Sequence, residues 1–177
     1  MEIKASYFYD IPARDLINIY HEKEFVKVRC QMPGLHGFEL NEFGEKEGKF
    51  VIAFRAEVVL PIPDKLPRFL LKRIKDKQTY VSFMAWDLEG GDTRRATIKG
   101  HMEGLPGEVF GECHVKPTGT GCTNYYSLTA SNNIPLVGKK VSALMGNDIK
   151  NGLEDEYKAT LRYIDEYYDR DSAQSVL

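Results

Sequence analysis

Apolar residues recur near the C-terminal end of the chain at the spacing of one helix face. Between residues 135 and 168 the series is Val141, Met145, Ile149, Leu153, Tyr157, Leu161, Ile164 and Tyr168. Charged and amide side chains fill most intervening positions, so the pattern predicts one long amphipathic helix. At about 1.5 Å per residue this helix would be roughly 50 Å long and would need an apolar surface to lie across.

Alternation of apolar and polar residues dominates the chain before this helix. It predicts strands over residues 2–9, 36–44, 49–60, 78–88, 92–103, 108–116 and 122–130. Turn signals separate them, such as the glycines and proline of 104–107. If that loop is four residues long, Lys99 faces Glu112 and Thr97 faces His114 across the hairpin, a favourable arrangement.

Three shorter helices complete the predicted order of elements. Asp10 as an acidic cap and Pro12 in the first turn open a helix that is followed by a second helical piece over 22–31. Residues 64–74 predict a small amphipathic helix inserted between strands. The order is therefore one strand, two short helices, six strands with one insertion, and the long helix.

This order indicates the α+β class. We expect a single domain over residues 1–170, in which a strongly bent antiparallel sheet of about seven strands faces the long helix. Residues 171–177 are expected to form a disordered tail. Side chains would fill the space between sheet and helix only in part, and such a space can hold a ligand.

Composition narrows the possible partners. The chain has 177 residues, 28% of them charged, and a net charge of −2, so no electrostatic argument favours nucleic acid or an anionic membrane. No stretch approaches a membrane span, and residues 1–5 lack the apolar core of a signal peptide. We expect a cytoplasmic protein with at most transient membrane contact and no obligate protein partner.

Motifs for metal, cofactor or nucleophilic chemistry are not found. Cys30, Cys113 and Cys122 form no Cys-x-x-Cys pair, and we interpret them as buried reduced thiols. The four histidines have no metal-ligand spacing, and phosphate-loop, dinucleotide and nucleophile-elbow motifs are lacking. The sequence predicts neither a metal nor a cofactor. The charge runs Arg94-Arg95 and Glu154-Asp155-Glu156 are interpreted as solvated faces.

The strand phases place one group of side chains on the concave face of the sheet, opposite the long helix. The candidate ligand-binding residues are Tyr7, Phe54, Trp86, Met102, Cys113, Asn124 and Tyr126 from the strands, with Met145, Ile149 and Leu153 from the helix. Plain core packing is the competing interpretation of each. Asn124 and Tyr126 are the best polar candidates, because a buried amide or hydroxyl is costly without a partner. Either can also bond a neighbour or a trapped water.

The order of elements resembles the helix-grip fold of the START-like superfamily, which includes lipid-transfer domains, plant pathogenesis-related proteins and polyketide cyclases. The chain is further similar to a bacterial branch of that superfamily known as a domain of unknown function. Four local patterns carry this similarity: Leu60-Pro61 with Lys65 to Leu70, Gly104 to Gly111, Gly119 to Thr123, and Ile134 to Lys139. Ser142 stands where an acidic residue early in the last helix would align, so any role of that acid does not carry over.

The resemblance implies a cavity under the long helix that binds an apolar or amphipathic molecule, sometimes with catalysis added. We expect the ligand to be lipid-like or polycyclic and the protein to be a carrier or sensor without chemistry. Two alternatives stay open. One is an enzyme of cyclase or dehydratase type, for which a lone Tyr126, Arg94 or His101 would suffice as acid or base. The other is a protein-docking module. Gly146 and Gly152 in the long helix either permit close packing or let the helix bend as a lid.

Overall fold

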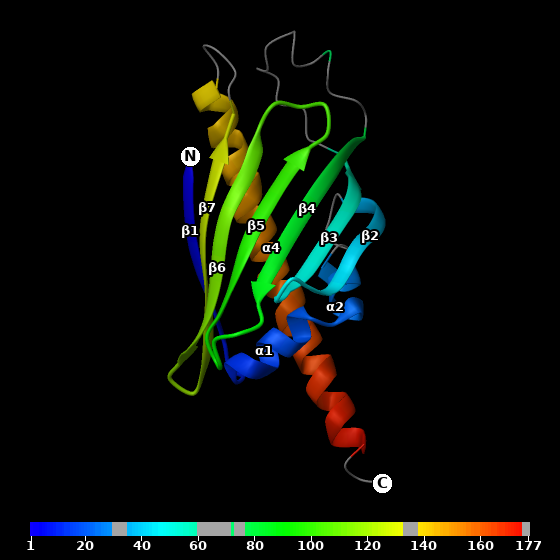
Figure 1. Cartoon of the computed structure of the whole chain (residues 1–177), viewed down its shortest axis with the longest axis vertical. Helices are drawn as coiled ribbons and strands as arrows, with labels where there is room; N and C mark the ends of the chain where they lie inside the picture. The colour runs from blue at the N-terminus through cyan, green and yellow to red at the C-terminus, as the bar shows by residue number, and fades with distance from the viewer. Residues whose placement is uncertain (30–34, 60–71, 73–76, 133–137, 175–177) are drawn as a thin grey trace.

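The computed structural model describes residues 1–29, 35–59, 72, 77–132 and 138–174. Its elements are β1 (Glu2–Tyr9), α1 (Ala13–Tyr20), α2 (Lys23–Arg29), β2 (Leu35–Lys46), β3 (Lys49–Val58), β4 (Gln78–Asp87), β5 (Arg94–Met102), β6 (Glu108–Thr118), β7 (Gly121–Ser131) and α4 (Gly138–Gln174). The strands form one antiparallel sheet in the order β1-β7-β6-β5-β4-β3-β2. The long helix α4 lies along one face of the sheet, and α1 and α2 lie at one end (Figure 1).

The α+β class and all seven strands predicted from the alternation are confirmed, with ends that differ by up to two residues. Apolar and polar residues alternate along the strands because one face of the sheet is covered and the other is exposed to water. Under this condition the period of two can be recognised in the sequence. The predicted helix over 64–74 lies outside the described residues. The helix α4 continues through Gln174, four residues into the stretch that was expected to form a tail.

The predicted register between β5 and β6 was wrong by two residues. Glu112 pairs with Thr97, and Lys99 pairs with Phe110. The last ladder pair before the turn is His101 with Glu108, so the connection is two residues longer than the assumed four. A shift of two keeps every side chain on its face of the sheet, and the predicted inner and outer phases therefore survive the error.

The start of α1 also differs from the prediction. Pro12 is the residue before the first helical turn, with extended backbone at φ −57° and ψ 145°, and no side chain caps the helix. The carboxylate of Asp10 instead accepts a hydrogen bond from the Thr120 hydroxyl, 3.2 Å away, across the start of β7. Asp10 thus ties the chain to the sheet rather than capping α1.

Along α4, the residues that contact the sheet shift progressively around the helix axis, away from the predicted apolar series. Each helical residue turns by about 100°, so a step of four residues exceeds one full turn by about 40°. Leu161, in the predicted series, is consequently 36% exposed, whereas Glu156, Thr160 and Tyr163 are buried. Glu156 was predicted to lie on a solvated face, and the structure corrects that prediction.

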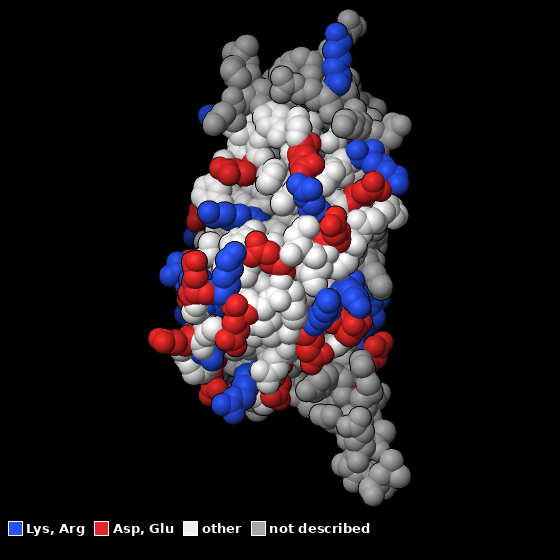
Figure 2. Space-filling model, turned by 45° about the vertical axis from the view of Figure 1, so that its right-hand side comes forward, with Lys and Arg blue, Asp and Glu red and all other residues white. Residues whose placement is uncertain are grey.

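The outer face of the sheet carries charges of both signs. Cross-strand ion pairs join Lys49 to Asp87 and Arg55 to Glu103, at 2.6 and 2.7 Å. Lysine and arginine side chains alternate with acidic ones over the face seen in Figure 2. Among the described helices, none is long and apolar enough to cross a membrane.

Candidate functional site

A largely buried ion pair joins the middle of α4 to the end of α2. Glu156 of α4 is 6% exposed, and its Oε2 accepts a hydrogen bond from Nη2 of Arg29 at 2.8 Å. The other carboxylate oxygen, Oε1, accepts from the hydroxyl of Tyr126 on β7 at 3.0 Å. Both oxygens of this buried carboxylate are therefore engaged, one of them by a cation, as a buried charge requires.

The network continues from Tyr126 through the amide of Asn124. Nδ2 of Asn124 donates to the hydroxyls of Tyr126 at 2.9 Å and of Tyr20 at 3.3 Å. The Tyr20 hydroxyl donates in turn to the Tyr9 hydroxyl at 3.3 Å. Asn124 is 0% exposed, and its Oδ1 atom has no hydrogen-bond partner among the described residues. The network thus contains one fully buried acceptor that this part of the chain leaves unsatisfied.

The phenols and the thiol of this region are held in their neutral forms. Burial, and then the negative charge of Glu156, raise the pKa values of Tyr20 and Tyr126. Burial and Glu156 likewise raise the pKa of the Cys113 thiol. The hydroxyls are consequently hydrogen-bond donors at neutral pH, and Cys113 is not a thiolate nucleophile.

Four of the residues predicted to contact a ligand lie together in this buried region. The alternation of β6 and β7 places Cys113 opposite Tyr126, and Trp86 is fully buried beside Tyr20, their ring centroids 5.5 Å apart. We call the interior around Trp86, Cys113, Asn124, Tyr126 and Glu156 the sealed end. Contact of these residues with a ligand stays a prediction.

Tyr7 lies at the border of the sealed end. Its ring meets that of Tyr126 edge to face, with the centroids 6.1 Å apart, and stacks on that of Tyr157 at 4.8 Å. Leu153, 8% exposed, belongs to the same core. Burial first, and then Glu154 and Glu156, raise the pKa of Tyr7.

The other predicted residues lie towards the N-terminal end of α4, away from α1 and α2. Met102, Met145 and Ile149 keep part of their surface accessible, and so does Tyr80, which pairs with Met102 across β4 and β5. Phe54 is 9% exposed and packs near Tyr80, the ring centroids 6.2 Å apart. We call the interior around Tyr80, Met102, Met145 and Ile149 the half-buried end.

Sequence reasoning missed Glu156 and Arg29, which anchor the sealed end. A usable signal for Glu156 was its place three residues after Leu153 and four before Thr160, which is the spacing of the buried face. No local pattern marks Arg29, because its partner is more than a hundred residues away in the chain. Arg94, predicted to be solvated, lies on the inner phase of β5, and its buried Nη1 has no hydrogen-bond partner among the described residues.

His21, at the end of α1, is a second partly buried group near the sealed end. Its ring stacks on Phe50 with centroids 4.1 Å apart, and its Nε2 has no hydrogen-bond partner within the described ranges. Burial, and to a smaller extent Arg94, lower the pKa of His21 from 6.5 to about 4. The imidazole is therefore neutral at physiological pH. His101, the histidine considered for catalysis in the sequence, is exposed on the outer phase of β5.

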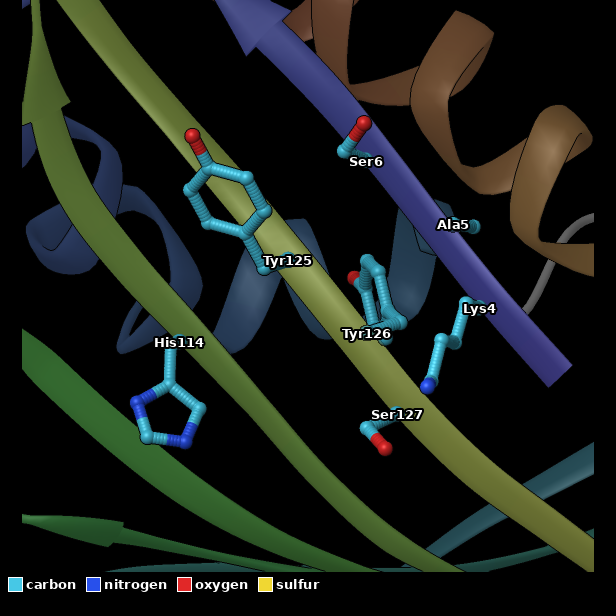
Figure 3. A pocket seen from close by; sticks show the side chains of 7 residues that line it. All are labelled: Lys4, Ala5, Ser6, His114, Tyr125, Tyr126 and Ser127. Carbon is cyan, nitrogen blue, oxygen red and sulfur yellow. The ribbon is translucent and has the colours of Figure 1, made fainter. Parts of the chain in front are cut away.

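A shallow hollow of about 360 Å³ lies on the opposite, outer face of the sheet. Its lining includes Lys4 and Ser6 of β1, His114 of β6, and Tyr125 and Ser127 of β7, and Figure 3 shows these side chains across the three strands. His114 bonds Glu112 at 3.0 Å, and Tyr125 is 42% exposed. The sequence pattern gave no indication of this hollow, because most of its lining residues lie on the solvated phase, with only Ala5 and Tyr126 on the inner one.

Metal ligands do not converge within the described part of the chain, where no group of three histidine, cysteine or acidic side chains could hold an ion. Cys113 and Cys122 are free and buried, as predicted, and burial raises the pKa of Cys122 to about 11. Cys30 lies outside the described residues.

Known structures share this architecture at low sequence identity. Human STARD10 is 15% identical with a TM-score of 0.61, over 95% of this chain and 66% of that chain. TTHA0849 from Thermus thermophilus is 17% identical with a TM-score of 0.59, over 92% and 99%. A STAR-related lipid transfer protein from Xanthomonas axonopodis is 14% identical with a TM-score of 0.54, over 90% and 85%. These likenesses show the fold.

A search of curated proteins found no match. The model of one protein family, described as "Protein of unknown function (DUF2505)", matches residues 4–164, nearly the whole chain. The chain therefore belongs to the DUF2505 family, and its domain has the START-like helix-grip fold that the order of its elements predicted.

Proposed function

We propose that this protein binds an apolar or amphipathic small molecule between the curved sheet and α4, as a carrier or sensor. The observation that carries the proposal is the contrast in burial along the interior. At the half-buried end, Met145 and Ile149 pack against the core and Met102 lies on the inner phase of β5, and all three keep accessible surface. Apolar side chains that face inward and remain accessible border a space that an apolar molecule would fill favourably.

The chemistry of the half-buried end suits an adaptable apolar ligand. Methionine is flexible and polarizable, so Met102 and Met145 would fit ligands of different shape. Tyr80 and Tyr7 offer rings with a polar tip at its two sides. A protein with the same fold, the STAR-related lipid transfer protein from Xanthomonas axonopodis, is named for lipid transfer, which supports the same function.

The test is to purify the protein from its native host and examine it by native mass spectrometry, with extraction of any molecule released on denaturation. We expect a bound lipophilic molecule. Ile149→Trp, which fills the half-buried end, should abolish its retention. Leu161→Trp, on the exposed side of the same helix, should leave it unchanged. A preparation free of small molecules, or equal retention by both variants, would refute the proposal.

A second candidate function is an enzyme of cyclase or dehydratase type in the same space. It is favoured by the convergence of Glu156, Arg29 and Tyr126 inside an apolar interior, since acids and bases at such positions serve proton transfer. A chemical change in the extracted molecule on incubation with the protein, lost in Tyr126→Phe, would establish this function over simple binding. An unchanged molecule would leave carriage as the function.

A further inference from the structure

Hydrogen-bond donation in the sealed end runs in one direction. Asn124 donates to Tyr126, and Tyr126 donates to Oε1 of Glu156. Arg29 donates to Oε2 of the same carboxylate. The acceptor at the end of this series is therefore satisfied twice, whereas the acceptor at its beginning, Oδ1 of Asn124, is satisfied by nothing in the described residues.

An unsatisfied acceptor in this position is unusual because the residue is completely buried. Asn124 is 0% exposed. Tyr126 donates its only hydroxyl proton to Glu156, so the amide atom 2.9 Å from that hydroxyl must be the nitrogen, because turning the amide over would place two acceptors against each other. Buried polar atoms in native proteins almost always have a partner. The group that satisfies Oδ1 must donate a proton, since an amide oxygen only accepts.

The charges around Asn124 restrict that donor to a neutral group. Burial, and then the negative charge of Glu156 one hydrogen-bonded residue away, raise the pKa values of Tyr20 and Tyr126 and keep both phenols protonated. The cation of the network, Arg29, is already bound to Glu156. Because Arg29 already neutralises Glu156, an ammonium head group would be buried without a counter-charge, and a carboxylate or phosphate head group would add a second negative charge near Glu156.

We propose that the ligand of this protein carries a neutral hydrogen-bond donor, such as the hydroxyl of a lipophilic alcohol, that binds Oδ1 of Asn124. This inference rests on the proposed function and specifies the head group of the molecule. The apolar body would extend past Tyr7 and Leu153 towards the half-buried end. Asn124 is the residue that distinguishes an alcohol from an acid or an ether of equal length.

The experiment compares three probes of equal chain length: 1-dodecanol, its methyl ether, and dodecanoate. Trp86, the single tryptophan of the chain, reports binding by its fluorescence, because it lies in the sealed end next to Tyr20. We expect 1-dodecanol to bind about tenfold more tightly than the ether, which lacks the donor. Dodecanoate at pH 8 should bind more weakly than the alcohol as well.

Asn124→Leu should bring the alcohol-to-ether ratio close to one, because it removes the acceptor and keeps a similar volume. Asn132→Leu, just past the far end of the same strand, is the matched control and should keep the wild-type ratio. Thermal unfolding of both variants checks that they fold. The comparison of probes on the wild-type chain stands without any variant.

Each outcome separates the inference from the proposed function. Equal dissociation constants for alcohol and ether on the wild-type protein mean that a trapped water or no group occupies Oδ1, and they overturn the inference alone. Tightest binding of dodecanoate also overturns it, because the network would then recruit an anion. Failure of all three probes to bind would count against the proposed function itself.

Discussion

The two ends of the space between the sheet and α4 differ in the chemistry of their side chains. The sealed end combines fully buried aromatic rings with a hydrogen-bonded network that links α1, α2, β7 and α4. The half-buried end consists of methionine, isoleucine and tyrosine side chains that keep accessible surface. Directional contacts fix one geometry, whereas flexible apolar side chains allow several. We infer that the sealed end holds α4 in place and fixes the head group of the ligand, whereas the other end adapts to the apolar body of the ligand.

The largest expected effect comes from breaking the ion pair of the sealed end. Glu156→Ala removes the carboxylate from the buried guanidinium of Arg29 and leaves Tyr126 without its acceptor, so we expect a loss of about 3–5 kcal/mol in the free energy of unfolding. Glu154→Ala, two residues earlier on an exposed side of α4, should change it by no more than about 0.5 kcal/mol. Urea unfolding of both variants measures the difference, and equal losses would contradict a special role for Glu156.

Apolar truncations along α4 test the contrast in packing. Leu153→Ala in the sealed end should cost about 2–5 kcal/mol, because the side chain is 8% exposed and leaves a cavity. Met145→Ala in the half-buried end should cost only about 1 kcal/mol, since less surface is removed from contact. In ligand binding the order should be reversed, so that Met145→Ala weakens binding more than Leu153→Ala does. If Met145→Ala destabilises the free protein as strongly as Leu153→Ala, the two ends are packed alike.

The stability of the sealed end at acidic pH depends on His21, which follows α1 and whose ring lies near that of Trp86. Its pKa is about 4 in the folded protein and 6.5 in the unfolded chain, so the unfolded chain binds more protons between these pH values. Stability is therefore full above pH 6.5 and decreases as the pH falls towards 4. Allowing for the partial exposure of the ring, the loss amounts to about 2 kcal/mol.

His21→Phe keeps the stacking on Phe50 and removes the titrating group, so it should flatten this part of the stability profile. His101→Gln, at an exposed position, should leave the profile as it is. The test is to measure the free energy of unfolding of the wild type and both variants at intervals from pH 7 to 4. A profile with the same slope in wild type and His21→Phe would assign the loss to other groups.

Sequence reasoning succeeded for the sheet and succeeded only in part for the helix, and the reason is physical. A strand has a period of two, so the inner positions Tyr7, Cys113 and Tyr126 follow without error even where the pairing register is wrong by two. A helix has no whole-number period, and the run of four-residue steps from Val141 to Leu161 moved the predicted face away from Glu156 and onto Leu161.

The candidate site was predictable to the same extent. Asn124 and Tyr126 stand two residues apart on one strand, so their shared face and their need for partners follow from the sequence. Arg29 and Glu156 come from separate helices, and only the packing of α2 against α4 brings them together. Charged residues in the sequence predict solvent exposure by default, which hides a buried pair until the fold supplies both partners.

The smallest expected effect concerns the two glycines of α4, which separate close packing from helix bending. A Cβ on Gly146 would lie in contact with the Met1 side chain, whereas a Cβ on Gly152 would meet nothing within 4 Å among the described residues. Gly146 therefore permits a close approach, and Gly152 has no such packing reason to be glycine. Gly152→Ala should raise the free energy of unfolding by about 0.5–1 kcal/mol through helix propensity alone.

Gly152 lies between Ile149 of the half-buried end and Leu153 of the sealed end, so the same variant tests whether α4 bends at their boundary. If the helix opens there to admit a ligand, Gly152→Ala should slow the association of 1-dodecanol, followed by Trp86 fluorescence in a stopped-flow instrument, while the equilibrium affinity changes little. Asn151→Ala, on the exposed side next to it, is the control for helix propensity. Equal association rates in all three proteins would mean that α4 stays straight and that the ligand enters elsewhere along the half-buried end.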